Sequence, residues 1–240
     1  MSSRPYFPEN AAYFFVLKKV LLMESCFSTL ESRLEAFRKA DLYPVISSEF
    51  CAGRDPFEIF CAAAEGGAKV IQIREKNWNK GEIHRLALRC REVANRFGVL
   101  IIIDDHVDVA LTAGADGVHL GQEDLPIDEA KRIAPKLLLG SSTHNLEEIL
   151  TAQRLGTGYL NIGPIFATQT KTVGIPPLGT ELLKELIPHV TVPFSVMGGI
   201  KERHIPELSA LGAARIAMVT EITQAPEPRE KVRELRKLIG

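Results

Sequence analysis

The sequence has no uninterrupted apolar run long enough for a membrane span and no excess of either charge. Its N-terminal apolar stretch, AAYFFVLKKVLLM at residues 11–23, is broken by Lys18 and Lys19, whereas a spanning helix needs about 20 apolar residues in succession. The 29 basic and 30 acidic side chains nearly cancel, so the overall charge gives no reason to expect a nucleic acid or an anionic membrane as a partner. An anionic ligand would have to be held by a few local groups.

Cysteine is scarce, and the four thiols form no CxxC pair and have no histidine at zinc-finger spacing. We therefore expect reduced thiols and a cytoplasmic protein. No GxGxxG follows the first predicted strand, which argues against a doubly wound nucleotide-binding sheet. Residues 11–23 also lack a preceding basic leader and an evident small-residue cleavage site, so they do not resemble a secretion signal.

The first 40 residues lack the pattern of the rest of the chain. We predict an N-terminal helical extension at residues 1–40, ahead of a catalytic domain at residues 41–240. Two interpretations of residues 11–23 stay open: an amphipathic accessory helix or oligomer contact, and leader sequence ahead of a true start at Met23. The sequence thus leaves a homo-oligomer open.

From Leu42 onward, short aliphatic or β-branched runs alternate with amphipathic stretches, as in parallel β/α units. Helix patterns such as GEIHRLALRCREVANRFG and NLEEILTAQRLG have apolar residues at three- and four-residue spacing and a glycine near the end. Eight such units predict the α/β class and a (β/α)8 TIM barrel, with a doubly wound open sheet as the alternative. The expected strands are 42–47, 69–74, 99–104, 117–120, 137–140, 158–163, 193–198 and 215–220.

A barrel would bring the polar residues that follow its strands together, because the carboxyl ends of all eight strands face one side. Three cations, Arg74, Lys76 and Lys171, would converge there with hydroxyl groups. Asp105 and Asp124 follow adjacent strands, where oxygen ligands can hold Mg2+ and leave positions for phosphate oxygens. We therefore predict a magnesium diphosphate site. Other polar residues at strand ends are Gln72, Asp104, Gln122, Glu123, Ser141, Ser142, His144, Thr168, Thr170 and Glu221.

Each of these motifs also has a purely structural interpretation. Asp104 and Asp105 could cap the helix that follows them, since acids are frequent at helix starts. Gln72 and Arg74 alternate on one strand and could fill the polar end of the barrel interior. The glycines of VMGGI could serve only a tight turn. Together with the turn after the eighth strand, however, they match the phosphate pocket that is common in these barrels.

Taken in order, the motifs resemble those of the thiamine phosphate synthase family over nearly the whole of residues 42–238. The motifs are QIREK, DD followed by VDVALTAGADGVHLGQEDLP, GSSTHNLEE, GPIFATQTK, GGI and MVTEI. The resemblance implies a TIM barrel that joins 4-amino-2-methyl-5-hydroxymethylpyrimidine diphosphate to a thiazole phosphate and releases diphosphate with the help of Mg2+. The partners would then be small phosphorylated substrates.

The resemblance also implies a role for each matching residue. Asp105 and Asp124 would bind magnesium, and Asp104 would contact the pyrimidine. The catalytic cations, which would stabilise the leaving diphosphate, would be Arg74, Lys76 and Lys171. The pyrimidine diphosphate would be held by Gln72, Arg74, Lys76, Ser142 and Lys171. The thiazole phosphate would be held by Thr168, Thr170, Gly199, Val219 and Thr220.

Three positions depart from the family pattern. Asp104 stands where asparagine is usual, and a carboxylate can accept a hydrogen bond from the pyrimidine amino group but cannot donate one. Ala167 replaces a proline, and Thr220 stands where serine is common; both changes are compatible with the same roles.

Two other functions stay open. A thiazole tautomerase of the same superfamily would use His144, in STHN, as its acid/base, although His144 could also be a helix-start residue. A non-catalytic barrel that binds phosphate ligands is a third interpretation, because the fold alone does not imply activity.

Overall fold

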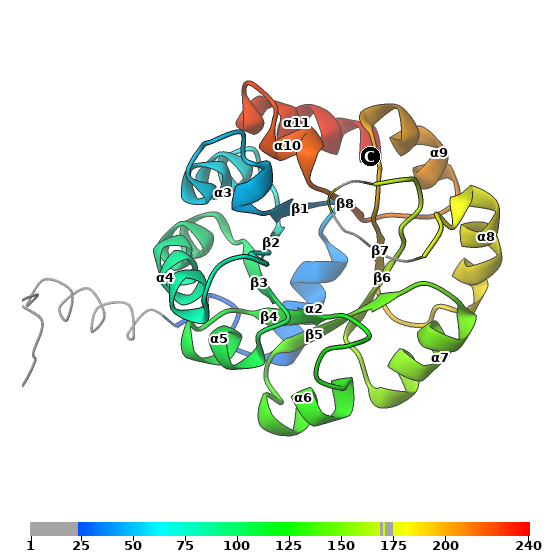
Figure 1. The fold of residues 1–240 in the computed structure, drawn as a ribbon, viewed down its shortest axis with the longest axis horizontal. Helices are drawn as coiled ribbons and strands as arrows, with labels where there is room; N and C mark the ends of the chain where they lie inside the picture. Colours follow the sequence, from blue (N-terminus) through cyan, green and yellow to red (C-terminus); the bar gives the residue numbers. More distant parts are fainter. Residues whose placement is uncertain (1–23, 169, 171–174) are drawn as a thin grey trace, which may run out of the picture.

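Eight parallel strands form a closed barrel in the computed structural model, which describes residues 24–168, 170 and 175–240. Each strand pairs with its sequence neighbours, and β8 closes on β1 through Leu42, which lies opposite Ile216. The predicted (β/α)8 TIM barrel is confirmed, with helices around the outside (Figure 1). The strands are β1 (Leu42–Ile46), β2 (Val70–Ile73), β3 (Leu100–Asp104), β4 (Gly117–Leu120), β5 (Leu138–Thr143), β6 (Tyr159–Ile162), β7 (Phe194–Val196) and β8 (Ile216–Met218).

Side-chain alternation along the strands divides the core into two parts. In β3, Ile101 and Ile103 pack into the layer between strands and helices, whereas Leu100 and Ile102 pack into a second cluster inside the barrel. Successive side chains of a strand point to opposite faces. Both faces of the sheet are therefore covered, which explains why the strands read as continuous apolar runs.

The helices begin and end at residues suited to those positions. In α4, Asn79 and Glu82 form a reciprocal capping box, and Gly98 ends the helix in the left-handed conformation. The helices around the barrel are α3 (Pro56–Glu65), α4 (Lys80–Phe97), α5 (Val107–Thr112), α6 (Ile127–Ile133), α7 (Leu146–Leu155), α8 (Gly179–Leu186), α9 (Ile205–Ala210), α10 (Thr220–Thr223) and α11 (Pro228–Ile239), with short 3-10 turns η1 (Ser48–Phe50), η2 (Ile187–His189) and η3 (Glu202–His204). In the ranges that the structure describes, no helix is both long and apolar enough to cross a membrane.

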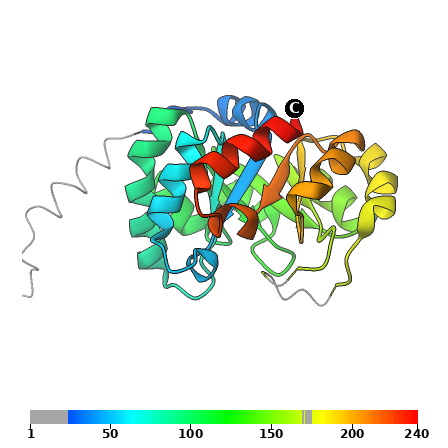
Figure 2. The ribbon, with the colours of Figure 1, turned by 90° about the horizontal axis from the view of Figure 1, so that it is seen from above.

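One helix of the predicted extension, α2 (Leu30–Arg38), covers the N-terminal end of the barrel. It lies across that end in Figure 2, on the side opposite the loops that follow the strands. Its Phe37 is fully buried against Tyr159, with ring centroids 4.2 Å apart. The boundary predicted at residue 40 therefore marks a change of sequence pattern, whereas the packing continues across it. Residues 1–23, including the alternative start at Met23, lie outside the described part of the chain.

Two predicted strand ends are wrong in a way that matters for the site. The strand expected at 137–140 runs on to Thr143, because Ser142 pairs with Asn161 and Thr143 with Ile162 of β6. Ser142 therefore sits on a strand and not in the loop after it. The strand expected to include Thr220 ends at Met218, and Thr220 begins α10.

Candidate active site

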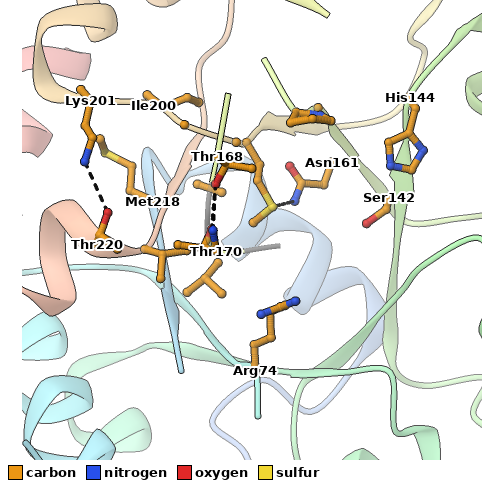
Figure 3. A pocket seen from close by; sticks show the side chains of 18 residues that line it. Arg74, Ser142, His144, Asn161, Thr168, Thr170, Ile200, Lys201, Met218 and Thr220 are labelled. Carbon is orange, nitrogen blue, oxygen red and sulfur yellow. Dashed lines mark hydrogen bonds between the residues drawn. The ribbon is translucent and has the colours of Figure 1, made fainter. Parts of the chain in front are cut away.

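A pocket opens at the carboxyl ends of the strands and is lined by most of the predicted site residues (Figure 3). Those that line it are Arg74, Ser142, His144, Thr168, Thr170, Gly199, Val219 and Thr220. The threonine hydroxyls of residues 168 and 170 lie 3.0 Å apart, and the Thr170 N–H donates to the Thr168 hydroxyl. Lys171, the third predicted cation, lies outside the described residues.

Next to Arg74, the ends of β2 and β3 form a dense cluster of charges. The Oδ2 atom of Asp104 lies 3.4 Å from Arg74 Nε and 2.9 Å from Lys76 Nζ. The same Lys76 amine also pairs with Asp105. Asp105 in turn contacts the carboxyl group of Asp124, from the loop after β4. Five predicted residues are thus brought together by three consecutive strands.

The carboxyl groups of this cluster titrate differently because their surroundings differ. Burial raises the pKa of Asp104, and the neighbouring Asp105 charge raises it further. Burial and the Asp105 charge also raise the pKa of Asp124. For Asp105, burial is outweighed by the hydrogen bond and the charge of Lys76, so its pKa is lowered. Like charges at short range are costly without a counter-cation, so this end of the site favours the binding of positive charge.

Asp105 and Asp124 fit a magnesium ion. They present two carboxylates from adjacent strands, and Mg2+ is commonly held by one or two carboxylates together with water and substrate phosphate oxygens. No group of three or more histidine, cysteine, aspartate or glutamate side chains with metal-binding geometry occurs among the described residues, so a site here would need oxygen atoms from a ligand or from water.

The capping interpretation of the two aspartates is wrong. The N-cap residue of α5 is His106 and neither aspartate, and the His106 side chain makes no capping hydrogen bond. Asp105 has a φ of 61°, a left-handed conformation that aspartate tolerates better than most residues. Its N–H donates to the His119 carbonyl at 2.8 Å. Its backbone is thus tied to β4, and its carboxylate faces Lys76 and Asp124 instead of the helix.

Gln72 faces the barrel interior, as the structural interpretation of QIREK predicts. It is 1% exposed, and its amide nitrogen donates to the Tyr43 hydroxyl at 3.1 Å. From there a hydrogen-bonded chain crosses the barrel: Tyr43 to Tyr159 at 2.9 Å, Tyr159 to His119 Nδ1 at 3.1 Å, and His119 Nε2 to Ser142 Oγ at 2.9 Å. Gln72 of β2 and Ser142 of β5 are therefore linked through the barrel interior.

The amide at one end of this chain fixes the direction of its first hydrogen bond. An amide nitrogen only donates, so the Tyr43 hydroxyl accepts from Gln72. Either hydroxyl can be the donor between Tyr43 and Tyr159, and the tautomer of His119 sets the donors at its two ring nitrogens. In either direction, the chain holds the Ser142 hydroxyl against His119 at the edge of the pocket.

His144 points into the pocket and does not cap the helix that follows. Asn145 is the N-cap residue of α7, and its side chain accepts from the Glu148 N–H. His144 Nδ1 lies 2.7 Å from Glu148 Oε2, which also accepts from the His144 backbone N–H at 2.9 Å. The imidazole is 9% exposed and is oriented by one carboxylate, so Nε2 can face a ligand.

The glycines after β7 allow two loops to touch. Gly199 has a φ of 62°, and a Cβ placed on it would lie 2.3 Å from the Ala167 carbonyl oxygen. Gly198 has a φ of 98°, and its carbonyl accepts from the Phe166 N–H at 2.9 Å. No side chain fits at residue 199, so the backbone of this loop borders the pocket directly.

A family model described as thiamine monophosphate synthase matches residues 42–222. The chain belongs to this family. A thiamine-phosphate synthase of Pelotomaculum thermopropionicum is 42% identical over 208 residues, which are 86% of this chain and 95% of that protein. The synthase of Shouchella clausii is 40% identical over 185 residues, covering 77% and 88%. The resemblance noted in the sequence is thus confirmed.

Solved structures agree with this membership in the thiamine monophosphate synthase family. The thiamine phosphate pyrophosphorylase from Pyrococcus furiosus is 35% identical, with a TM-score of 0.78, and the match covers 85% of this chain and 96% of that one. A 3-hexulose-6-phosphate synthase, at 22% identity and a TM-score of 0.62, shares the fold alone.

Several residues of the pocket were not predicted from the sequence. Asn161, Met197 and Lys201 line it, and His119 lies beneath it, bonded to Ser142. Lys201 directly follows the GGI motif, so its position in the sequence could have indicated that it lies near the pocket. His119 gave no signal, because its contact with Ser142 depends on the register between β4 and β5.

Proposed function

We propose that this chain is a thiamine-phosphate synthase, which joins a hydroxymethylpyrimidine diphosphate to a thiazole phosphate and releases diphosphate. The observation that carries the proposal is the cluster of Arg74, Lys76, Asp105 and Asp124, which meets the pocket through Arg74. Elsewhere the pocket is lined by hydroxyl and backbone donors. The first part suits a metal-bound diphosphate, and the second suits a phosphate monoester.

Each end of the pocket would hold one substrate. Arg74, Lys76 and Lys171 would contact the diphosphate oxygens, and the Ser142 hydroxyl would donate its proton to the pyrimidine diphosphate. Gln72 would support this substrate from the barrel interior. The thiazole phosphate would receive hydrogen bonds from hydroxyl and backbone groups of Thr168, Thr170, Gly199, Val219 and Thr220.

In the reaction, the bond between the pyrimidine methylene carbon and the diphosphate oxygen breaks, and its electron pair leaves with the diphosphate. The lone pair of the thiazole nitrogen then forms the new carbon–nitrogen bond. Preplaced cations lower the barrier because negative charge grows on the leaving group. Mg2+, held by Asp105 and Asp124, would add positive charge at that place. The reaction requires no protein nucleophile.

Asp104 gives this site a charge that the usual asparagine would lack. Its carboxylate lies against Arg74 and Lys76, the two cations proposed for the diphosphate. It would accept from the pyrimidine amino group, while also holding the cations in place before the substrate arrives.

A thiazole tautomerase is the second candidate, and one observation favours it: the contact of His144 with Glu148 in the pocket. A carboxylate that fixes one imidazole nitrogen leaves the other for proton transfer. The cluster of Arg74, Lys76, Asp105 and Asp124 favours the synthase.

We further propose a cytoplasmic location. The four cysteines are unpaired in the structure, which is the state expected for a reducing compartment.

The test is product formation by the purified protein with pyrimidine diphosphate, thiazole phosphate and Mg2+, with each component omitted in turn. Thiamine phosphate and diphosphate should appear together, and only in the complete mixture. Binding of both substrates without turnover would instead indicate the non-catalytic barrel. Conversion of one thiazole phosphate isomer to another, abolished by His144→Ala, would indicate the tautomerase.

A further inference from the structure

Lys201 is a pocket cation to which nothing above assigns a role. It lies in the loop between β7 and α9, two residues after Gly199, and lines the pocket beside Val219 and Thr220. Its Nζ atom is 2.9 Å from Glu221 Oε1. It is also 3.4 Å from the Thr220 hydroxyl, the contact drawn in Figure 3. The side chain is 40% exposed, so its ammonium group remains accessible.

Charge is unevenly distributed over the pocket. Among the described residues that line it, Arg74 and Lys201 are the cations. Arg74 belongs to the cluster at the ends of β2 and β3, whereas Lys201 follows β7, with β8 and β1 between the two. The end formed by Gly199, Val219 and Thr220 otherwise offers hydroxyl and backbone donors. A phosphate monoester carries about two negative charges near neutral pH, and a charged donor stabilises it more than neutral donors do.

The loop fixes where Lys201 lies. Gly198 and Gly199 bring its backbone against the loop after β6, as described above. His204 stacks on Phe166 with ring centroids 3.9 Å apart. The Lys201 N–H donates to His204 Nδ1 at 3.1 Å. Glu221 also accepts from the Glu202 N–H at 3.1 Å, so the carboxylate that holds the Lys201 amine is itself held.

We propose that Lys201 binds the phosphate group of the thiazole substrate and that Glu221 positions its ammonium group for this contact. The inference rests on the proposed function for the identity of the substrate. Lysine donates through three N–H groups, so Nζ can keep its bond to Glu221 while it donates to a phosphate oxygen beside Thr220. Recognition of the phosphate would thus use one cation at this end, separate from those that hold the diphosphate.

The test compares three variants in steady-state kinetics with both substrates. Lys201→Met should raise the KM for thiazole phosphate about 10-fold, as expected for the loss of one charged hydrogen bond. The KM for pyrimidine diphosphate should change less than about 2-fold. Lys201→Arg should restore most of the affinity, because it keeps the charge. Lys231→Met is the matched control: Lys231 also pairs with a carboxylate, Glu202 at 3.0 Å, but does not line the pocket.

Calorimetric titration of the same proteins with thiazole phosphate and with inorganic phosphate separates this inference from the proposed function. If wild type forms thiamine phosphate and Lys201→Met behaves like Lys231→Met, the Lys201 inference is overturned and the synthase stands. If wild type forms no product but binds phosphate through Lys201, the phosphate site stands and the synthase fails. If wild type neither turns over nor binds phosphate, both are overturned.

Discussion

Two clusters of charged residues lie at opposite ends of the same barrel and differ in what surrounds them. At the N-terminal end, the fully buried Asp116 accepts from Arg91 at 2.8 Å and from the Ile101 N–H at 2.8 Å. Ser25 and Arg33 of the N-terminal segment also reach this carboxylate. One aspartate is therefore surrounded by donors from its own chain and closed off from solvent.

At the other end, carboxylates face one another. Lys76 pairs with both Asp104 and Asp105, and Arg74 pairs with Asp104. Burial and neighbouring negative charge raise the pKa of Asp104 and Asp124. The cluster is open to the pocket through Arg74. A single buried carboxylate that is surrounded by donors stabilises the fold, whereas several carboxylates crowded together beside a pocket are arranged for a ligand.

The largest effect on stability should come from breaking the buried cluster around Asp116. Asp116→Ala leaves Arg91 buried without its carboxylate, and such a loss costs about 3–5 kcal/mol. Urea unfolding at fixed pH measures it, and the KM values of the folded variant should match wild type. A loss below about 1 kcal/mol would show that the cluster does not hold the barrel together.

The cluster of Asp104, Asp105 and Asp124 should respond in the opposite way, with a loss of activity and little loss of stability. Asp105→Asn removes one of the two proposed magnesium ligands, and kcat should fall roughly 10²–10³-fold, as when a preorganised charge-stabilising group is lost. Its free energy of unfolding should change by less than about 1 kcal/mol, because the lost pairing with Lys76 is offset by relief of repulsion from Asp124.

The matched control for that variant is Asp108→Asn, which removes an exposed aspartate that pairs with Lys80 at 2.9 Å on the following helix. It should leave both kcat and stability close to wild type. Equal losses of activity in the two variants would contradict a specific role for Asp105.

A smaller effect is expected from the hydrogen-bonded chain inside the barrel. His119→Phe removes the hydrogen-bond partner of Ser142 and should raise the KM for pyrimidine diphosphate about 3- to 10-fold, as expected for the loss of one hydrogen bond. In a Ser142→Ala background the same change should have no further effect on this KM, because the two residues act through one bond. Additive effects of the two substitutions would contradict the chain.

The smallest effect concerns pH. Burial raises the pKa of Glu221, but the hydrogen bond from Lys201 outweighs it, so the pKa is lowered. A carboxyl group whose pKa is lower in the folded state stabilises the fold at pH values above its pKa in the unfolded chain, which is about 4.3. This stabilisation is lost as the pH falls through the pKa of the folded state. The stability difference between wild type and Lys201→Met should be below about 1 kcal/mol for this partly exposed pair. This difference in stability, measured by urea unfolding, should shrink as the pH is lowered from about 6 to about 4. A difference that grew toward acidic pH would contradict the lowered pKa of Glu221.

The barrel and the cluster of charges at the ends of β2, β3 and β4 were predictable, because both follow from the order of short patterns along the chain. Alternating strand and helix patterns indicate the barrel, and the barrel brings Arg74, Lys76, Asp105 and Asp124 to one side whatever the details of packing. Residues whose partners depend on register were not predictable. The contact of His119 with Ser142 needs the alignment of β4 with β5, and that of Ser25 with Asp116 joins positions 91 residues apart. Gln72 was placed on the right strand, but the motif alone did not decide whether it faces the pocket or the interior.

The most direct test of whether one end of the barrel stabilises the fold and the other binds the substrates is to measure activity and stability together for Asp105→Asn and Asp116→Asn. We predict that the kcat for thiamine phosphate formation with Mg2+ falls roughly 10²–10³-fold in Asp105→Asn, while its unfolding free energy stays near wild type. Asp116→Asn should lose stability while its folded fraction keeps wild-type kcat and KM values. If Asp116→Asn lost activity without losing stability, or Asp105→Asn kept full activity, the division of the barrel into a stabilising end and a reactive end would be contradicted.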